Sequence, residues 1–208
     1  PRLGPFNIHG SVLPAYRGAA PIQRALLDGA IKTGVTFLRV DARCDAGPIV
    51  SMAETAVGPN ENFGALHARL SRMAVLLLEE FVMQCCSGRL PMGRPQDESQ
   101  ATAAPKIKKE DLHLLFDRSA AEVHNRIRAF SPSPGAFAVW GGRRIKFLKS
   151  RLPADHEPRA TSGDPPGTVG VSHDGRCLTI ACAGSAGLHV EEVQPEGARV
   201  QTAREMFN

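Results

Sequence analysis

The stretch NIHGSVLPAYRGAAPI, residues Asn7–Ile22, lies close to the start of the sequence. Phe6–His9 is expected to be the end of a strand, which places an amide and an imidazole at one edge of a sheet. Open α/β sheets bind their ligands at the edge where the strands end. A later loop, Asp41–Gly47, is expected to return to the same edge and to bring a carboxylate, Asp45. We therefore expect these three side chains to lie close together.

The amide of Asn7, the imidazole of His9 and the carboxylate of Asp45 are a sufficient set for moving an acyl group onto an amine. The amide and the imidazole can stabilise an oxyanion, and the carboxylate can manage the proton. The alternative is structural: a turn residue, a histidine satisfied within the core, and a cap. No spacing rule identifies such a trio from residue types alone, so the surrounding sequence has to decide.

The surrounding sequence resembles that of the formyltetrahydrofolate-dependent formyltransferases. Residues 7–23 are similar to the signature of that family, which is shared among its branches. The later similarity is greatest to the branch that formylates methionyl-tRNA. Its blocks are Thr33–Thr36, Asp45–Ile49, Ala101–Ile107, Arg126–Ala136, Val193–Gly197 and Ala203–Asn208.

The resemblance implies a reaction in which the α-amino group of methionyl initiator tRNA attacks the formyl carbon of 10-formyltetrahydrofolate. It implies that Asn7 and a protonated His9 donate hydrogen bonds to the formyl oxygen as negative charge develops there. Asp45 would keep His9 charged and accept, through water, the proton that the amine releases. No metal is required, and the remaining histidines lack the spacing of metal ligands.

The loop after the expected strand, together with the glycine that follows Asp45, is assigned by the resemblance to substrate and folate binding. Gly18 is expected to let the backbone approach a ligand, and Arg17 either to fix the loop or to meet a charged end of the substrate. The stretch CDAG at residues 44–47 departs from the family's usual Leu-Asp-Thr-Gly, which removes a hydroxyl beside the carboxylate. The assigned residues are Ser11, Leu13, Pro14, Arg17, Gly18 and Gly47.

Positive charge is unevenly distributed along the chain, whose formal net charge is +4. Residues 104–150 hold ten Lys or Arg against four Asp or Glu, a net charge of +6, whereas residues 151–208 hold five against eight, a net charge of −3. A basic segment suits a polyanion, because each phosphate contact releases condensed counterions. A solvated basic face without a partner is the alternative, and the resemblance favours tRNA. The residues expected to contact it are Lys106, Lys108, Lys109, Arg126, Arg128, Arg143, Arg144 and Lys146.

The sequence predicts an α/β chain in two parts. Residues 1–88 are expected to form an incomplete Rossmann-like formyltransferase domain, and residues 89–110, which are rich in Pro, Gly and polar residues, a linker. Residues 111–208 are expected to form a small β-barrel of the oligonucleotide-binding type, an OB-like tRNA-binding domain, because short strands alternate there with Gly-rich turns.

The first part is expected to hold two helices. One runs from Pro21 towards Asp28, and the other is capped by Asn60 and ends at Gly88. The longer helix carries a core-packing stripe at helical spacing: Phe63, Leu66, Leu70, Met73, Leu77 and Phe81.

The second part is expected to start with a helix that has a capping box at Ser119 and Glu122 and ends near Phe130. Residues 156–166 are expected to form a flexible excursion. The strands predicted over both parts, apart from Phe6–His9, are Val35–Val40, Ile49–Ala53, Ala136–Trp140, Arg144–Lys149, Thr168–Ser172, Cys177–Cys182 and Leu188–Val193.

The family's catalytic domain begins with strands and helices that precede the position of Asn7, on the order of 100 residues. We therefore expect the chain to lack the N-terminal part of that domain. Such a fragment would expose sheet edges and an apolar face and would be poorly stable alone.

Three functions remain open from the sequence. A sister formyltransferase or a formyltetrahydrofolate hydrolase would share Asn7, His9 and Asp45, and an inactive tRNA-binding fragment would need none of them. The expected partners are initiator methionyl-tRNA and 10-formyltetrahydrofolate, with a monomeric protein and no membrane. The five cysteines lack zinc or redox spacing and are expected to be reduced, in a bacterial cytoplasm or, in a eukaryote, a mitochondrial matrix.

Overall fold

The structure is a computed structural model that describes residues 4–154, 164–172, 175–184 and 187–207. The chain divides into two compact units. The first comprises residues 1–25, 30–61 and 65–107, and the second comprises residues 26–29, 62–64 and 108–208. The division at residues 107 and 108 falls within the predicted linker, and each unit is described by itself.

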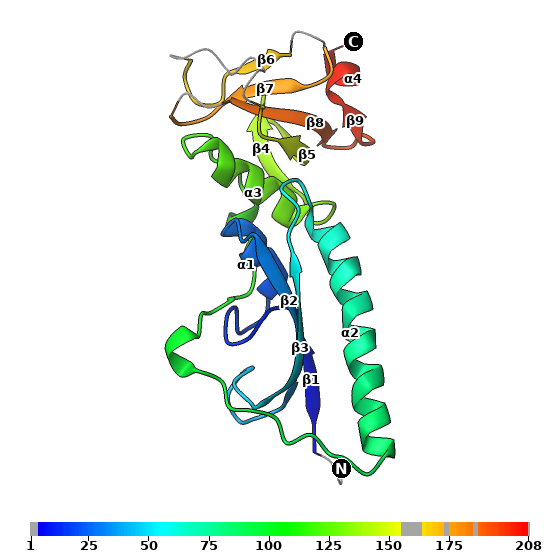
Figure 1. The fold of residues 1–208 in the computed structure, drawn as a ribbon. Coiled ribbons are helices and arrows are strands. Elements are labelled where there is room, and N and C mark those ends of the chain that lie inside the picture. The colour runs from blue at the N-terminus through cyan, green and yellow to red at the C-terminus, as the bar shows by residue number, and fades with distance from the viewer. Residues whose placement is uncertain (1–3, 155–163, 173–174, 185–186, 208) are drawn as a thin grey trace. The chain divides into compact units, whose positions relative to one another are not determined.

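The sheet of the first unit has three strands in the order β1-β2-β3 (Figure 1). They are β1 (Phe6–His9), β2 (Lys32–Arg39) and β3 (Ile49–Ala56), so the three predicted strands are confirmed, and β2 and β3 are longer than expected. Both ladders are antiparallel. His9 therefore lies opposite Thr36 in the middle of β2. The expected placement at a common carboxyl edge is wrong for this sheet, because antiparallel neighbours end at opposite edges.

Helices α1 (Pro21–Leu27) and α2 (Phe63–Cys86) are both confirmed. Pro21 suits the first helical position because it needs no backbone donor there, and Gly29 follows the helix with a φ of 68°. Because α2 begins at Phe63, the predicted cap at Asn60 is wrong, since Asn60 lies in a turn that precedes the cap position. In the described chain, no helix is sufficiently long and apolar to span a membrane.

The predicted stripe of α2 packs inward. Leu66, Leu70, Leu77 and Phe81 are buried, and the Phe81 ring lies 4.7 Å between centroids from both Phe6 and Phe37. The expected exposed apolar face and sheet edge are also observed. Among the described strands, β1 pairs with β2 alone, and α2 exposes large apolar side chains. These are Val75, Leu76, Leu78, Val82 and Met83.

The second unit contains one longer helix and a six-stranded antiparallel sheet. Helix α3 (Ala120–Phe130) starts with the predicted capping box, in which Ser119 and Glu122 exchange hydrogen bonds. The sheet order is β4-β5-β8-β7-β6, with β9 paired to β8. The strands are β4 (Ala136–Trp140), β5 (Arg143–Arg151), β6 (Val169–Val171), β7 (Leu178–Ala181), β8 (Gly187–Pro195) and β9 (Gln201–Thr202), followed by the short helix α4 (Ala203–Phe207).

The expected closed barrel is not confirmed. Among the described strands, β4 and β6 are the two ends of the sheet and do not pair with each other, so the sheet stays open. The predicted hairpin turn is confirmed: Gly141 and Gly142 adopt φ values of 56° and 76°, which a type I′ turn requires at both positions. The sequence did not predict β9 and α4, which are too short to show a periodicity.

The predicted linker contains two 3-10 turns, Glu98–Gln100 and Lys109–Leu112. Before the first of these turns, Arg94 forms an antiparallel bridge with Ile49 of β3. The linker is therefore ordered by contacts with the first unit. Most of the predicted excursion at residues 156–166 lies outside the described residues.

Candidate functional site

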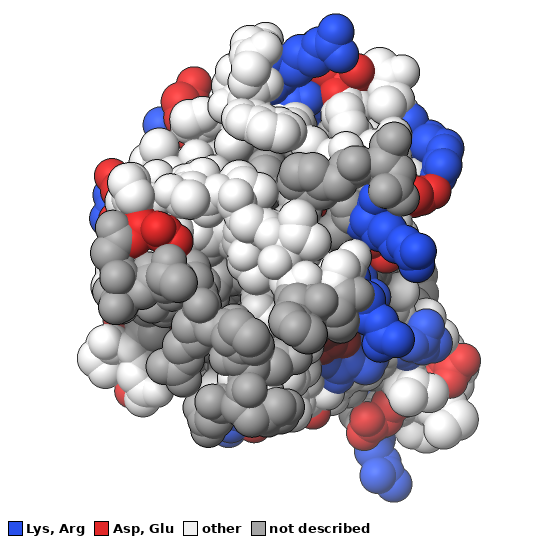
Figure 2. All heavy atoms as spheres, turned by 90° about the horizontal axis from the view of Figure 1, so that it is seen from above, with Lys and Arg blue, Asp and Glu red and all other residues white. Residues whose placement is uncertain are grey.

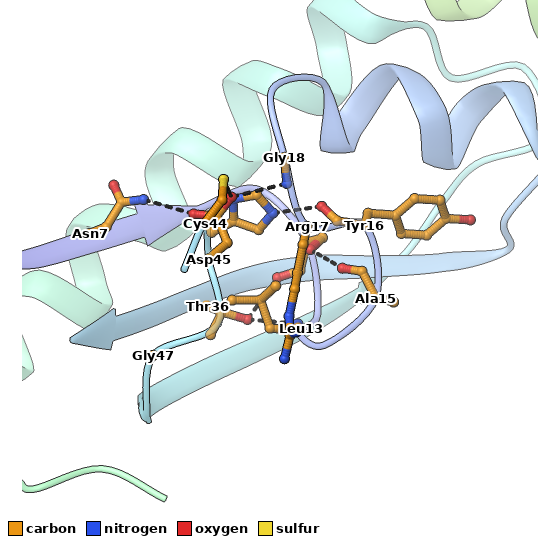
Figure 3. Close-up of polar contacts among 12 residues, drawn as sticks. Asn7, Leu13, Ala15, Tyr16, Arg17, Gly18, Thr36, Cys44, Asp45 and Gly47 are labelled. Carbon is orange, nitrogen blue, oxygen red and sulfur yellow. Dashed lines mark hydrogen bonds and ion pairs between the residues drawn. The ribbon is translucent and has the colours of Figure 1, made fainter. Parts of the chain in front are cut away.

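Asn7 and His9 of β1 both lie against Asp45. Figure 3 shows the Asn7 amide directed at the Asp45 carboxylate. The Asn7 Nδ2 donates to Asp45 Oδ1 at 3.3 Å, and His9 Nδ1 is 3.5 Å from Asp45 Oδ2. The amide is exposed, whereas the imidazole is buried and the Asp45 side chain is 12% exposed. The Asn7 and His9 side chains thus share one carboxylate, and the Asn7 amide faces solvent.

Both ring nitrogens of His9 face oxygen acceptors. Its Nε2 lies 2.8 Å from the backbone carbonyl oxygen of Tyr16, and its Nδ1 faces the Asp45 carboxylate. Only the imidazolium form donates from both nitrogens. Both ring nitrogens are therefore directed at acceptors within the chain, and the Tyr16 carbonyl occupies the direction in which Nε2 would donate to a substrate.

The loop after β1 is fixed to β2 by a buried threonine. Thr36 Oγ1 donates to the backbone carbonyl of Ser11 at 2.7 Å and accepts from the backbone N–H of Leu13 at 3.1 Å. Ser11 Oγ donates to the Ala15 carbonyl at 2.5 Å. Ser11 and Leu13 are both buried, so their observed contacts hold the loop in shape. Thr36 was missed because a threonine within a strand carries no signal in sequence.

Backbone atoms crowd the two glycines beside the carboxylate. The backbone N–H of Gly18 donates to Asp45 Oδ2 at 3.0 Å, and a Cβ on Gly18 would lie 2.7 Å from the Ala104 carbonyl oxygen. A Cβ on Gly47 would lie 1.8 Å from the Arg39 carbonyl oxygen. Both positions therefore need glycine, because another backbone segment of the chain passes close to them. This close approach explains the glycine at position 18 without any ligand.

Arg17 fixes the loop, which is the first of its two expected roles. Its guanidinium donates to Gln96 Oε1 from Nε at 3.1 Å and from Nη2 at 2.8 Å, and forms an ion pair with Glu98 at 2.9 Å. The Gln96 amide in turn donates to the backbone carbonyls of Asp45 and Gly47, each at 2.8 Å. Gln96 was not predicted, because it lies in the linker, about 50 residues from the loop that it contacts.

The Cys44 thiol donates to Asp45 Oδ2 at 3.3 Å. That hydrogen bond and the negative charge of Asp45 raise the pKa of the Cys44 thiol. No disulfide joins any of the five cysteines, all of which lie among the described residues. No cluster of three His, Cys, Asp or Glu suited to a metal ion occurs among the described residues.

The predicted tRNA contacts are not equally accessible. Lys106, Lys108 and Lys109 are exposed, whereas Arg126 is half-buried and donates to the Asp111 carbonyl at 2.6 Å. Arg128 is only 6% exposed. A buried guanidinium is not presented to a phosphate, so the structure gives no support to the predicted contact at Arg128.

The remaining predicted contacts lie on β5. Arg143 and Arg144 are exposed and Lys146 is half-buried, and the Arg144 guanidinium lies 4.3 Å from the centroid of the Phe137 ring. Arg144 and Lys146 line one open pocket. Figure 2 shows that Lys and Arg side chains gather towards one side of the visible surface, with acidic side chains among them.

Two family models match the chain. One, described as formyl transferase, covers residues 1–82, and the other, described as formyl transferase, C-terminal domain, covers residues 106–208. Among relatives, a methionyl-tRNA formyltransferase from Synechococcus sp. (strain JA-2-3B'a(2-13)) is 40% identical over 211 residues, and one from Methylococcus capsulatus is 38% identical over 208 residues. Each match covers 100% of this chain and, respectively, 64% and 65% of the relative. The chain thus spans slightly less than two thirds of the length of these relatives.

Solved structures share the fold. A sugar 3N-formyl transferase, WlaRD, has a TM-score of 0.71 at 18% identity, over 93% of this chain and 66% of that one. HypX from Aquifex aeolicus in complex with tetrahydrofolic acid has a TM-score of 0.69 at 18% identity, over 98% of this chain and 34% of that one. With both family models matched in order, and with relatives of about 40% identity along its whole length, the chain belongs to the formyl transferase family.

Proposed function

We propose that this chain carries the reacting groups of a methionyl-tRNA formyltransferase. The reaction moves the formyl group of 10-formyltetrahydrofolate onto the α-amino group of methionyl initiator tRNA for translation initiation. The observation that carries the proposal is the meeting of Asn7, His9 and Asp45 around one carboxylate. The names of the relatives support the acceptor, because those with 38–40% identity are methionyl-tRNA formyltransferases.

Asn7 is the proposed donor to the formyl oxygen. An amide NH2 group has two protons, and one of them suffices for the Asp45 carboxylate. The exposed amide can direct the other towards the oxygen on which charge develops. The hydrogen-bond donors present here therefore suit an acyl-transfer centre.

His9 and Asp45 manage charge and protons in this proposal. Nitrogen attack on the formyl carbon forms the new C–N bond. The bond to the folate nitrogen then breaks, and that nitrogen takes up, through water, the proton that the amine has lost. Asp45 accepts the amine proton through water and stabilises the imidazolium of His9. For His9 to donate to the formyl oxygen as well, its Nε2 must give up the contact with the Tyr16 carbonyl.

Folate and tRNA are assigned to different groups of residues. We propose that a set of loop residues shapes the folate pocket, namely Ser11, Leu13, Pro14, Arg17, Gly18 and Gly47. The tetrahydrofolic acid complex of a structural relative supports this choice of donor. Residues 1–88 would be the rear part of a Rossmann-like catalytic domain and residues 111–208 the OB-like tRNA-binding domain, with residues 89–110 between them. We propose a monomer in the bacterial cytoplasm. The proposed phosphate contacts are the exposed cations Lys106, Lys108, Lys109, Arg143 and Arg144.

The acceptor is tested by comparing methionyl initiator tRNA with free methionine and a sugar amine, each with 10-formyltetrahydrofolate. We expect transfer to the tRNA alone, with a rate at low tRNA concentration that falls steeply as salt rises, because phosphate contacts are salt-sensitive. A salt-insensitive transfer to a small amine would assign the chain to a sister branch. Salt-sensitive tRNA binding without transfer, unchanged in His9→Ala, would leave only a tRNA-binding fragment.

A further inference from the structure

The side-chain amide of Gln96 joins the two loops that carry the candidate site. Its Nε2 donates to the carbonyl oxygens of Asp45 and Gly47, and its Oε1 accepts from the Arg17 guanidinium. A backbone carbonyl can only accept and a guanidinium can only donate. The orientation of the amide is therefore dictated by its partners, and both of its ends are used.

These contacts close a ring around Asp45. Arg17 is followed directly by Gly18, whose backbone N–H donates to the Asp45 carboxylate at 3.0 Å. Asp45 is thus held at its carboxylate by Gly18 and at its backbone carbonyl by Gln96, while Gln96 is held by Arg17. The ring belongs entirely to the first unit.

The backbone of Asp45 requires such support. Its φ is 49°, in the left-handed region that residues other than glycine adopt only where the surroundings hold them. Gln96 bonds to the carbonyl of Asp45 itself and to the carbonyl two residues later. Both bonds therefore act on the turn that aims the Asp45 carboxylate at Asn7 and His9.

We propose that Gln96 is a positioning residue for Asp45, through which the segment between the two family domains sets the geometry of the reacting groups. Gln96 does not touch the Asn7 or His9 side chains in the contacts described, and it acts on them only through Asp45. The expected effect of Gln96 on catalysis rests on the proposed function, whereas its expected effect on the position of Asp45 does not.

The test uses two matched substitutions in the full chain, Gln96→Glu and Gln100→Glu. A carboxylate at position 96 keeps the contact with Arg17 but has no N–H for the two carbonyls. Gln100 lies four residues along the same segment, is exposed, and donates from its side-chain amide to Asp97 Oδ2 at 2.8 Å. Gln96→Met is a second, uncharged variant of similar length, for use if the glutamate variant does not fold.

Nuclear magnetic resonance reads the geometry directly. We expect the signals of the Asn7 side-chain amide and of the His9 ring nitrogens to change in chemical shift in Gln96→Glu. The same signals should keep their chemical shifts in Gln100→Glu. Unchanged signals in a folded Gln96→Glu or Gln96→Met variant, or equal shifts in the Gln100→Glu control, would overturn the proposal. This readout decides the proposal even if the wild-type chain transfers no formyl group, an outcome that would count against the proposed function alone.

Steady-state kinetics measure the effect of the Gln96 substitution on catalysis. We expect kcat to fall on the order of 10²-fold in Gln96→Glu, because misplacing a reacting group by about 1 Å has that effect, while KM for both substrates changes little. The Gln100→Glu variant should keep the wild-type kcat. A variant with shifted Asn7 and His9 signals but an unchanged kcat would overturn the catalytic part of the proposal.

Discussion

Substituting alanine for Gly47 should disrupt the loop that carries Asp45. The added Cβ would lie 1.8 Å from the Arg39 carbonyl oxygen. Real Cβ contacts are essentially never shorter than 3.0 Å, so the two atoms must separate by at least 1.2 Å. The obstacle is backbone within β2 and cannot rotate away as a flexible side chain could.

The expected cost follows from the contacts that such a movement breaks. Overpacking of this kind costs about 1–3 kcal/mol. The Arg39 N–H donates to the Pro48 carbonyl at 3.0 Å, and Gln96 donates to the Gly47 carbonyl at 2.8 Å. Losing two hydrogen bonds at about 1 kcal/mol each brings the expected loss to about 3–5 kcal/mol. A small domain is stable by only about 5–15 kcal/mol.

Urea unfolding followed by circular dichroism measures this loss, with Gly142→Ala as the control. Gly142 also has a positive φ, of 76°, but a Cβ there would meet nothing within 4 Å. The control should therefore lose only the backbone strain of about 1–2 kcal/mol. If Gly47→Ala were no less stable than Gly142→Ala, the close approach at Gly47 would not constrain the loop, and the reasoning would be refuted.

Three further predictions concern the rest of the chain. Ser119→Ala removes the cap of α3 and should lower the free energy of unfolding by about 1 kcal/mol in urea. Hydrogen bonds from Thr202 and Arg199 lower the pKa of Glu205 to about 2 from 4.5. The stability that it contributes is therefore present above pH 4.5 and lost as the pH falls to about 2, so Glu205→Gln should differ from the wild type in thermal unfolding at pH 6 and match it near pH 2. Burial raises the pKa of Cys182 to about 11, so iodoacetamide at pH 8 should label exposed Cys86 long before Cys182, as intact mass would show.

The elements with a periodic or capping signal were predictable from the sequence. The stripe of α2, the box at Ser119 and the turn at Gly141 were expected where they occur, because local residue patterns decide them. The direction of strand pairing was not predictable, because periodicity is the same in parallel and antiparallel sheets. Barrel closure was not confirmed among the described strands, and strand number alone does not fix which edges meet.

The candidate site likewise contains residues that the sequence predicted and residues that it did not. Asn7, His9 and Asp45 were found through the resemblance of the sequence around them, and the structure places them together. The supports of the site were missed, because Thr36 and Gln96 act through contacts between distant segments. The burial of Arg128 was also missed, since a basic residue in a basic segment shows nothing of its exposure.

The most direct test is formyl transfer from 10-formyltetrahydrofolate to methionyl initiator tRNA by this chain, with His9→Ala beside His113→Ala. His9 contacts the Asp45 carboxylate, whereas His113 packs on Phe137 in the second unit. We predict transfer by the wild type and the His113→Ala variant, and a loss on the order of 10²–10³-fold in His9→Ala, as when one stabilising donor is removed. Transfer by His9→Ala at the wild-type rate, or no transfer by any of the three, would contradict the proposal that these residues form the reacting centre.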